Sequence, residues 1–299
     1  MRATNGRFAA TLPEGTRREN AIKLIRKDQI CAFNIHYAYY SLEYCLNSLE
    51  KLGVTKVELL AGHPGLWLDH RGFEDTRPIR RMLADRHIQC PVITPANCEF
   101  AYQYGAPEKE QFERSFQYFA NGIRMGAELG AKILMANSGW GYWNEPFDDG
   151  IKRAAEMHSR LCEVAEEYDM YIACESLRPQ ESLIGETLGK VKTLFDMVNH
   201  PRFKAMVDLT AMAVSGESIQ EWFDVFGTEN IIHAHFVDGN PYGHLVWGEG
   251  NRNLQKDLEV MLANGYQGVY SQELTDASYF ADPYDVDKRN VWSLFQYAE

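Results

Sequence analysis

The chain has 299 residues, of which 45% are hydrophobic, and its formal net charge is −12. This length suits one large α/β barrel or two ordinary domains, and the apolar share is typical of a globular protein with a sizeable core. An acidic chain is a poor ligand for nucleic acid or an anionic bilayer, and no run of 18 apolar residues is present, so we predict no nucleic acid partner and no membrane association.

The first 28 residues are basic and lack the apolar centre of a signal peptide. We interpret residues 1–28 as an arm that packs on the rest of the molecule or on a neighbouring subunit, which favours a homo-oligomer. The six cysteines show no CxxC spacing, and several fall inside apolar runs. This pattern is typical of reduced, buried thiols and favours a cytoplasmic location.

From residue 29 onward, short β-branched or apolar runs alternate with longer stretches whose apolar residues recur every three or four positions. The predicted strands are residues 30–35, 56–62, 88–94, 131–138, 170–176, 204–210, 231–237 and 268–274. The predicted helices are residues 40–53, 75–86, 107–130, 148–168, 185–200, 216–227, 253–265 and 284–299. Ser41, Asp148 and Ser215 are predicted N-caps, and Asp282-Pro283 is a predicted helix entrance.

Eight strand–helix units in about 270 residues have the size and order of a (β/α)8 barrel. We therefore predict a single TIM barrel over residues 29–299, preceded by the short N-terminal arm. A doubly wound open sheet is the alternative, but it usually has fewer units and often a glycine-rich phosphate turn after its first strand. Here the first strand runs into HYAYYSLEY, which contains no glycine.

Four successive predicted strands end in a carboxylate or an imidazole. They are Glu175 in YIACES, Asp208 in KAMVDLT, His235 in IIHAHFVDG and Glu273 in GVYSQELT. If these strands line one barrel, the four side chains converge at its carboxyl rim. Side chains alternate along a strand, so the neighbours two positions earlier should fill the barrel below, and those one position earlier should face the helices. The inward set is Ala173, Met206, His233 and Ser271, and the outward set is Cys174, Val207, Ala234 and Gln272, of which Gln272 fits poorly.

Three carboxylates and one imidazole are hard ligands that suit Mn²⁺ or Mg²⁺, with Co²⁺ also acceptable. Each residue alone is more often a solvated rim residue, a cap former or a buried histidine. The joint placement on four consecutive strands favours a metal site, because the active sites of such barrels lie at this rim. A cation flanked by two glutamates is suited to moving a proton beside a sugar carbonyl.

Residues 170–275 resemble the xylose isomerase-like barrel superfamily, and within it the ketose 3-epimerase branch of tagatose, psicose and fructoselysine 3-epimerases. The matching segments are CESLRPQES, MVDLTAM, HAHFVDG with GHLVWGEGN, and QELT. The resemblance implies that Glu175, Asp208, His235 and Glu273 bind one divalent metal. It also implies that Glu175 and Glu273 are the acid/base pair acting through a metal-stabilised enediolate.

The resemblance also suggests substrate contacts around the rim. Glu181 matches the second glutamate of the family, His244 matches a histidine of fructoselysine-type members, and Gly248 and Gly250 resemble the glycine loop. Glu58 faces inward by alternation and resembles a recurring pocket or structural residue. Further predicted pocket residues follow the first, second and fourth strands: His36, His63, Trp140 and Trp143. Each of these rim residues has an ordinary alternative as a salt bridge, a surface histidine or loop packing.

Two positions depart from psicose-type members, which have a histidine where Ala211 stands and an arginine where Pro241 stands. These departures favour a modified, bulkier or different substrate over a free ketohexose. Two alternatives to an isomerase or epimerase stay open. One is a lyase that cleaves a 3-keto-glycoside, including a 3-keto-C-glycoside, by metal-assisted β-elimination. The C-glycoside deglycosidase large subunits resemble this superfamily, and such a lyase is expected to need a small partner subunit. The other is a catalytically silent sugar-binding barrel.

Overall fold

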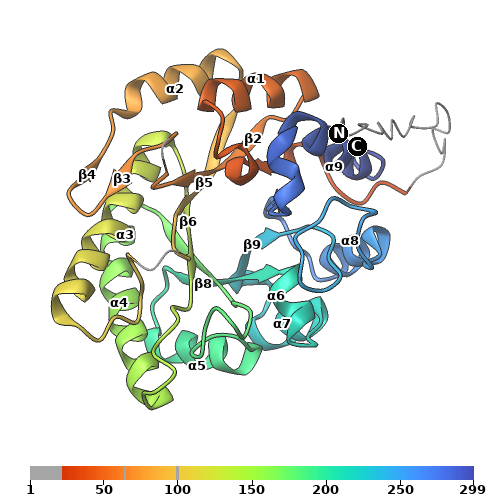
Figure 1. The fold of residues 1–299 in the computed structure, drawn as a ribbon. Helices are drawn as coiled ribbons and strands as arrows, with labels where there is room; N and C mark the ends of the chain where they lie inside the picture. Colours follow the sequence, from red (N-terminus) through yellow and green to blue (C-terminus); the bar gives the residue numbers. More distant parts are fainter. Residues whose placement is uncertain (1–21, 64, 99–100) are drawn as a thin grey trace, which may run out of the picture.

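The computed structural model describes residues 22–63, 65–98 and 101–299 as a closed barrel of eight parallel strands (Figure 1). The order around the barrel is β1-β10-β9-β8-β7-β6-β5-β2. The strands are β1 (Ile30–Phe33), β2 (Lys56–Ala61), β5 (Gln89–Pro95), β6 (Ile133–Asn137), β7 (Tyr171–Glu175), β8 (Phe203–Asp208), β9 (Ile231–His235) and β10 (Tyr270–Gln272). All eight predicted strands are present, and the prediction of a single (β/α)8 barrel is confirmed.

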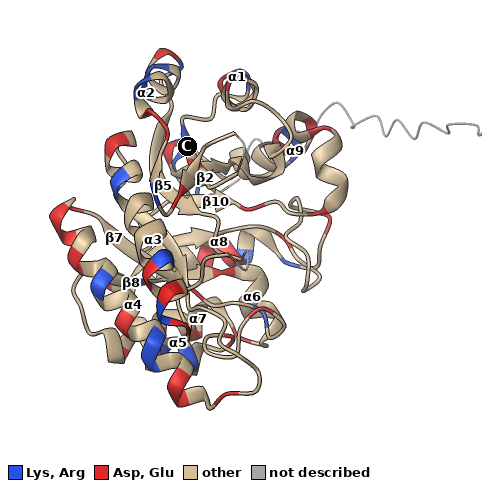
Figure 2. Cartoon of the chain, turned by 60° about the vertical axis from the view of Figure 1, so that its left-hand side comes forward, with Lys and Arg blue, Asp and Glu red and all other residues tan. Residues whose placement is uncertain are grey.

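A ring of helices surrounds the strands, and outer helices such as α3, α4 and α5 carry many of the charged residues (Figure 2). The predicted helices appear as α1 (Leu42–Leu52), α2 (Thr76–Asp85), α3 (Lys109–Leu129), α4 (Phe147–Glu167), α5 (Leu188–Val198), α7 (Ile219–Phe226), α8 (Leu254–Ala263) and α9 (Pro283–Phe295). The structure adds elements that the sequence pattern did not predict. These are the hairpin β3 (Leu68–Asp69) and β4 (Gly72–Phe73), helix α6 (Leu209–Val214), and the short helices η1 (Lys27–Gln29), η2 (Asn34–Tyr37), η3 (Thr228–Asn230) and η4 (Ala277–Ala281).

Two of the predicted N-caps are wrong. Ser41 does cap α1, but α4 begins after Pro146, whose φ of −62° already suits a first turn, so Asp148 lies inside the helix. Helix α7 is capped by Ser218, whose side chain accepts from the Glu221 amide while the Glu221 carboxylate accepts from the Ser218 amide. Ser215 instead ends α6.

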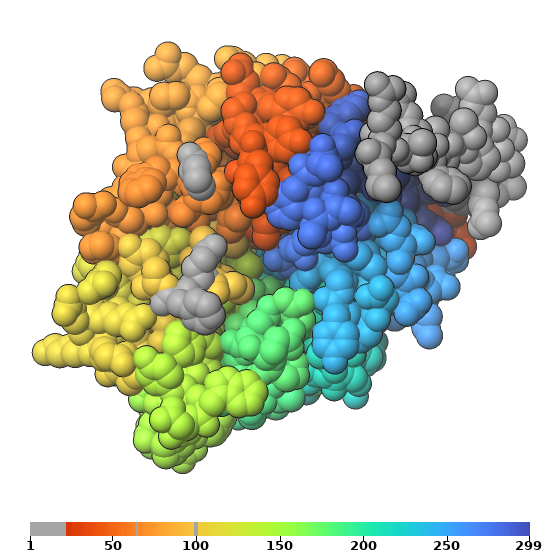
Figure 3. Space-filling model, viewed as in Figure 1, coloured from red at the N-terminus to blue at the C-terminus, as the bar shows by residue number. Residues whose placement is uncertain are grey.

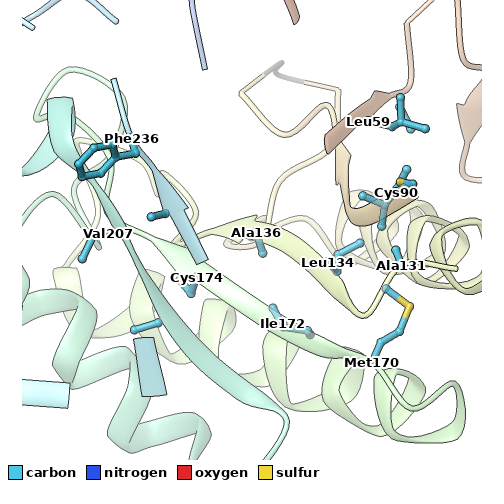
Figure 4. Packing of buried hydrophobic residues seen from close by; sticks show 14 of the residues in the cluster. Leu59, Cys90, Ala131, Leu134, Ala136, Met170, Ile172, Cys174, Val207 and Phe236 are labelled. Carbon is cyan, nitrogen blue, oxygen red and sulfur yellow. The ribbon is translucent and has the colours of Figure 1, made fainter. Parts of the chain in front are cut away.

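The predicted alternation of side chains is confirmed. The inside of the barrel holds a small apolar cluster that includes Ala173 and Met206, whereas Cys174, Val207 and Ala234 belong to the main core between strands and helices. Figure 4 shows part of this outer layer, with Leu134, Ile172 and Val207 among its labelled residues. Gln272 also faces outward, and it is accommodated because its side-chain oxygen accepts from Asn290 of α9.

The two ends of the described chain are joined by backbone hydrogen bonds. Leu24 N donates to Tyr297 O over 2.9 Å, Glu299 N donates to Ile25 O over 3.0 Å, and Ile25 forms a parallel bridge with Ala298. The greater part of the predicted arm, residues 1–21, lies outside the described residues, so its packing stays a prediction. Among the described helices, none combines the length and the apolar character needed to cross a bilayer.

Candidate metal centre and sugar site

The four residues that end consecutive strands meet at the carboxyl rim. From His235 Nδ1 the distance is 3.4 Å to Glu175 Oε2, 3.5 Å to Asp208 Oδ2 and 3.0 Å to Glu273 Oε2. One ligand atom from each residue lies within 4.8 Å of the others, and Glu273 is the least buried member, with 15% of its side chain exposed. We call Glu175, Asp208, His235 and Glu273 the quartet.

Strand register explains why the quartet forms. Asp208 pairs with His235 across β8 and β9, and His235 pairs with Ser271 of β10, two residues before Glu273. Parallel barrel strands finish at the same rim, so inward side chains at matched positions share one space. Asp208 also caps α6, because its Oδ1 accepts from the amides of Thr210 and Ala211 over 2.7 and 2.8 Å. The other oxygen of Asp208, Oδ2, is thereby left to face the other three residues of the quartet.

The chemistry of the quartet fits a divalent cation. His235 Nδ1 is buried and has no partner with hydrogen-bond geometry, although three carboxylate oxygens approach it within 3.5 Å. Burial raises the pKa of Glu175 to about 8, to which the charges of Glu273 and Asp208 add against the opposing effect of His235. Clustered carboxylates that repel one another in a buried site are a common arrangement around a hard cation. The quartet therefore offers four ligands for a divalent cation.

His244 lies directly beside the quartet. Its Nε2 is 3.1 Å from Asp208 Oδ2 and 3.0 Å from Glu273 Oε2, and only 7% of the residue is exposed. Burial alone would lower the pKa of His244, but the charges of Glu273 and Asp208 outweigh it and raise the pKa to about 10. An imidazole at this position can orient two quartet carboxylates. The predicted contact of His244 with the substrate would have to use a part of the ring other than Nε2.

Asp238, which the sequence did not single out, holds the glycine loop that follows β9. Its two oxygens accept from the backbone amides of Gly248, Gly250 and Arg252, each over 2.9 Å. A Cβ atom on Gly250 would lie 2.4 Å from Asp238 Oδ1 and 2.5 Å from Gly239 O, so this close approach requires glycine. The segment HFVDG that contains Asp238 carried a usable signal, since an aspartate before a glycine loop commonly accepts backbone amides.

Glu181 is tied to Arg178, a second residue that sequence reasoning missed. Glu181 Oε2 accepts from the Arg178 amide over 2.9 Å and from Arg178 Nε over 3.0 Å, and its Oε1 pairs with Nη2 of the same side chain. Arg178 Nη1 also donates to Tyr242 O over 2.9 Å and so links the loops after β7 and β9. Both carboxylate oxygens of Glu181 are therefore engaged, and its role as a sugar contact stays a prediction.

The two predicted rim histidines have separate environments. His36 is fully buried, and its Nε2 lies 3.0 Å from Asp287 Oδ1 on α9, while the hydroxyl of Tyr37 donates to Asp287 Oδ2 over 2.8 Å. His63 Nδ1 accepts from the Gly65 amide over 3.2 Å, and its Nε2 is buried. These contacts anchor the rim loops, and a role in binding substrate stays a prediction for both residues.

The loop after β6 brings aromatic side chains to the rim. Trp143 is 71% exposed, whereas Trp140 is half-buried and packs edge-on against Tyr142 with ring centroids 5.4 Å apart. Trp140 O also accepts from the amide of Leu183 over 3.1 Å. In the space-filling view, segments from the early, middle and late parts of the chain meet around the centre of the face that is turned toward the reader (Figure 3). Exposed aromatic rings on such loops can stack on the apolar face of a sugar.

A closed (β/α)8 barrel with a carboxylate–imidazole quartet at its carboxyl rim defines a class of barrel proteins suited to binding a divalent cation. The chain belongs to the xylose isomerase-like TIM barrel family, whose model matches residues 46–291.

Several relatives and solved structures are similar to this chain. Fructoselysine 3-epimerase of Shigella flexneri is 26% identical over 237 residues, which cover 78% of this chain and 85% of the relative. L-ribulose-5-phosphate 3-epimerase UlaE of Escherichia coli is 22% identical over 230 residues, covering 73% and 77%. A solved structure of L-ribulose 3-epimerase superposes with a TM-score of 0.75 at 16% identity, covering 90% of this chain and 94% of that one. The 3-keto-D-glucoside 4-epimerase YcjR of E. coli gives a TM-score of 0.74 at 13% identity, covering 89% and 98%.

Proposed function

We propose that this protein is a divalent-metal-dependent sugar epimerase or isomerase that moves a proton next to a ketose carbonyl. Relatives named as ketose epimerases support an enzyme of this kind. The observation that carries the proposal is the convergence of Glu175, Asp208, His235 and Glu273 within 4.8 Å of one another. In the proposal this quartet holds Mn²⁺, Mg²⁺ or Co²⁺, and the substrate is a carbohydrate.

The bound cation would stabilise the negative charge that develops on the substrate oxygens during proton transfer, an effect worth several kcal/mol. Glu175 at the end of β7 and Glu273 after β10 approach the site from two different strands, and two bases on separate sides of a carbon can invert it. One glutamate takes the proton and the other returns one to the opposite face. In this proposal His244 holds Glu273 in place during the step, because its Nε2 lies 3.0 Å from Glu273 Oε2.

Deuterium wash-in tests this function. The Mn²⁺-loaded protein is incubated in D₂O with a panel of ketoses, and the exchanging carbon is located by mass spectrometry and NMR. We expect exchange next to the carbonyl for at least one ketose, and we expect Glu273→Gln to reduce it by roughly 10²–10⁴-fold, the range for loss of a general acid or base. Undiminished exchange in Glu273→Gln would remove Glu273 from the acid/base pair.

The proposed substrate is a substituted ketose without a phosphate group. Three arginines are each paired with a carboxylate. Arg178, after β7, pairs with Glu181; Arg252, after β9, pairs with Asp257; and Arg289, on α9, pairs with Glu249. A phosphate binds best to cationic groups that are not already neutralised. We therefore expect a ketose to have a higher kcat/KM than its phosphate ester, and the reverse order in a direct comparison would contradict this substrate class.

Elimination from a 3-keto-glycoside is the second candidate, because the exposed Trp143 in the loop after β6 suits an aromatic aglycone. The same glutamates would remove the proton, but the glycosidic bond would then break and release the aglycone. Including 3-keto-C-glycosides in the wash-in panel separates the two reactions, since elimination liberates a free aglycone and epimerisation does not. Copurification of a small partner subunit would favour the lyase. Sugar binding without exchange on any substrate would favour a silent binding barrel.

A further inference from the structure

Glu58, in the middle of β2, lies inside the barrel beneath the quartet and is completely buried. Four side-chain donors surround its carboxylate. Oε1 accepts from Thr94 Oγ1 over 2.5 Å and faces His235 Nε2 at 3.3 Å. Oε2 accepts from Ser271 Oγ over 2.5 Å and faces His233 Nε2 at 2.9 Å. A buried carboxylate is costly unless it is fully hydrogen-bonded, and this one is.

The contact with His235 determines which ring nitrogen carries hydrogen. A carboxylate can only accept, so the Nε2 atom that faces Glu58 must donate. The neutral ring then has its lone pair on Nδ1, the atom that lies among the three carboxylates of the quartet. Phe33 packs against the same imidazole with ring centroids 5.6 Å apart and planes 24° apart, which further restricts rotation of the ring.

We propose that Glu58 is the positioning residue of the metal centre: it fixes the tautomer and the orientation of His235 so that Nδ1 is presented to the cation. This inference rests on the proposed function, in which the quartet holds a divalent metal. Hydrogen-bond partners of ligand imidazoles typically change metal affinity by about 10–100-fold. Glu58 acts through His235 and not on the substrate.

A second cation held by Glu58, His233 and His235 is the competing interpretation, because their ligand atoms are also close together. The hydrogen bonds argue against it. Each oxygen of Glu58 already meets two donors, which occupies the roughly four lone-pair directions of a carboxylate. A cation at this place would have to displace hydroxyl or imidazole donors that surround Glu58 on several sides.

Calorimetric titration of the metal-free full chain with Mn²⁺ tests the proposal. We expect one equivalent to bind to the wild type and Glu58→Gln to bind it about 10–100-fold more weakly, since an amide group would direct its own hydrogens at donors. The visible absorption spectrum of the Co²⁺-loaded protein should also change, because a rotated His235 ring alters the ligand geometry. Asp287→Asn is the matched control: it removes a buried carboxylate of α9 that pairs with His36, and it should leave the Mn²⁺ affinity unchanged.

The outcomes separate the inference from the proposed function. If the wild type binds Mn²⁺ tightly and a folded Glu58→Gln binds it equally well, the positioning role is wrong and the metal site stands. If the wild type binds no divalent metal, the proposed function fails and this inference fails with it. Two equivalents in the wild type, one of them lost in Glu58→Gln, would make Glu58 a ligand and overturn the proposal.

If Glu58→Gln does not fold, Thr94→Val and Ser271→Ala replace it. Each removes one hydroxyl that donates to Glu58, and neither replaces a quartet residue. We expect each to weaken Mn²⁺ binding several-fold, with the Co²⁺ spectrum shifted in the same direction. Unchanged affinity and spectrum in both folded variants would contradict the positioning role.

Discussion

His244 Nε2 lies 3.0 Å from Glu273 Oε2, the same oxygen that His235 Nδ1 approaches to 3.0 Å. Burial by itself would raise the pKa of Glu273, but the two imidazoles outweigh it and hold the pKa at about 2. One carboxylate oxygen is therefore shared by two rings that come from a strand and from the loop after it. This geometry makes His244 important for where Glu273 points.

Replacement of His244 by glutamine should impair proton transfer more than metal binding. We expect the exchange rate in the wash-in assay to fall by about 10–100-fold, because Glu273 and Asp208 both lose a charged donor, and the Mn²⁺ affinity to fall by less than tenfold. The matched control is His70→Gln. In the wild type, Nδ1 of His70 lies 2.8 Å from the Tyr102 hydroxyl. Equal losses in both variants would mean that His244 has no specific effect on Glu273.

Removal of divalent metal should lower thermal stability. A cation that binds only the folded chain adds about 2.7 kcal/mol at a free concentration 100 times its Kd. For a chain of this size we expect chelation to lower the Tm by roughly 5 °C, measured by scanning calorimetry with excess Mn²⁺ and with EDTA. Asp208→Asn lacks a proposed ligand and should show little difference between the two conditions. A wild-type Tm that is insensitive to EDTA would contradict a metal in the quartet.

His158 should make the fold sensitive to acid. This residue of α4 is fully buried, its Nε2 donates to Asn137 O over 3.0 Å, and its Nδ1 has no partner. Burial lowers the pKa of His158 to about 3, from 6.5, against a small opposing effect of the Asn137 carbonyl. As the pH falls from 6.5 towards 3, the unfolded chain gains a proton at this histidine that the folded chain does not. Stability is therefore lost at about 1.4 kcal/mol per pH unit across that window.

A His158→Phe variant isolates this effect. Phenylalanine retains the ring contacts with Tyr104 and Phe203, whose centroids lie 4.5 and 4.9 Å away, and removes the titration. Urea unfolding of both metal-free proteins between pH 4.5 and 7.5 gives the two slopes of unfolding free energy against pH. The variant starts lower, by about 1 kcal/mol for the lost hydrogen bond, and should have the shallower slope. Identical slopes would show that His158 is not responsible.

Substitution of Gly250 by alanine should disturb the glycine loop. The added Cβ would meet backbone atoms of Gly239 as well as Asp238, and backbone cannot move aside as a flexible side chain can. We expect a loss of about 1–3 kcal/mol in unfolding free energy and a lower exchange rate, since the loop also carries His244. Gly72→Ala is the control, because no atom lies within 4 Å of its added Cβ. Wild-type stability in Gly250→Ala would mean that the loop tolerates a shift.

The sequence predicted the features that depend on local periodicity. Period-two alternation placed Glu175, Asp208 and His235 on one face, and parallel strands that end at one rim then brought them together. Long-range partners were beyond this reasoning, because no local pattern links residues such as His36 and Asp287, which are 251 positions apart. Arg178 was missed because its pairing with Glu181 depends on the fold of a loop. The β3–β4 hairpin was missed because two-residue strands are too short to show a period.

The bridge between Ile25 and Ala298 has a practical consequence for protein engineering. Because the segments around these residues run alongside each other, a short linker could connect residue 299 to residue 22 without crossing the barrel. New ends could then be opened at Gly216, where an added Cβ would meet no atom within 4 Å. Circular permutants of this design would leave every barrel strand uninterrupted, and their new ends would lie in the turn between α6 and α7.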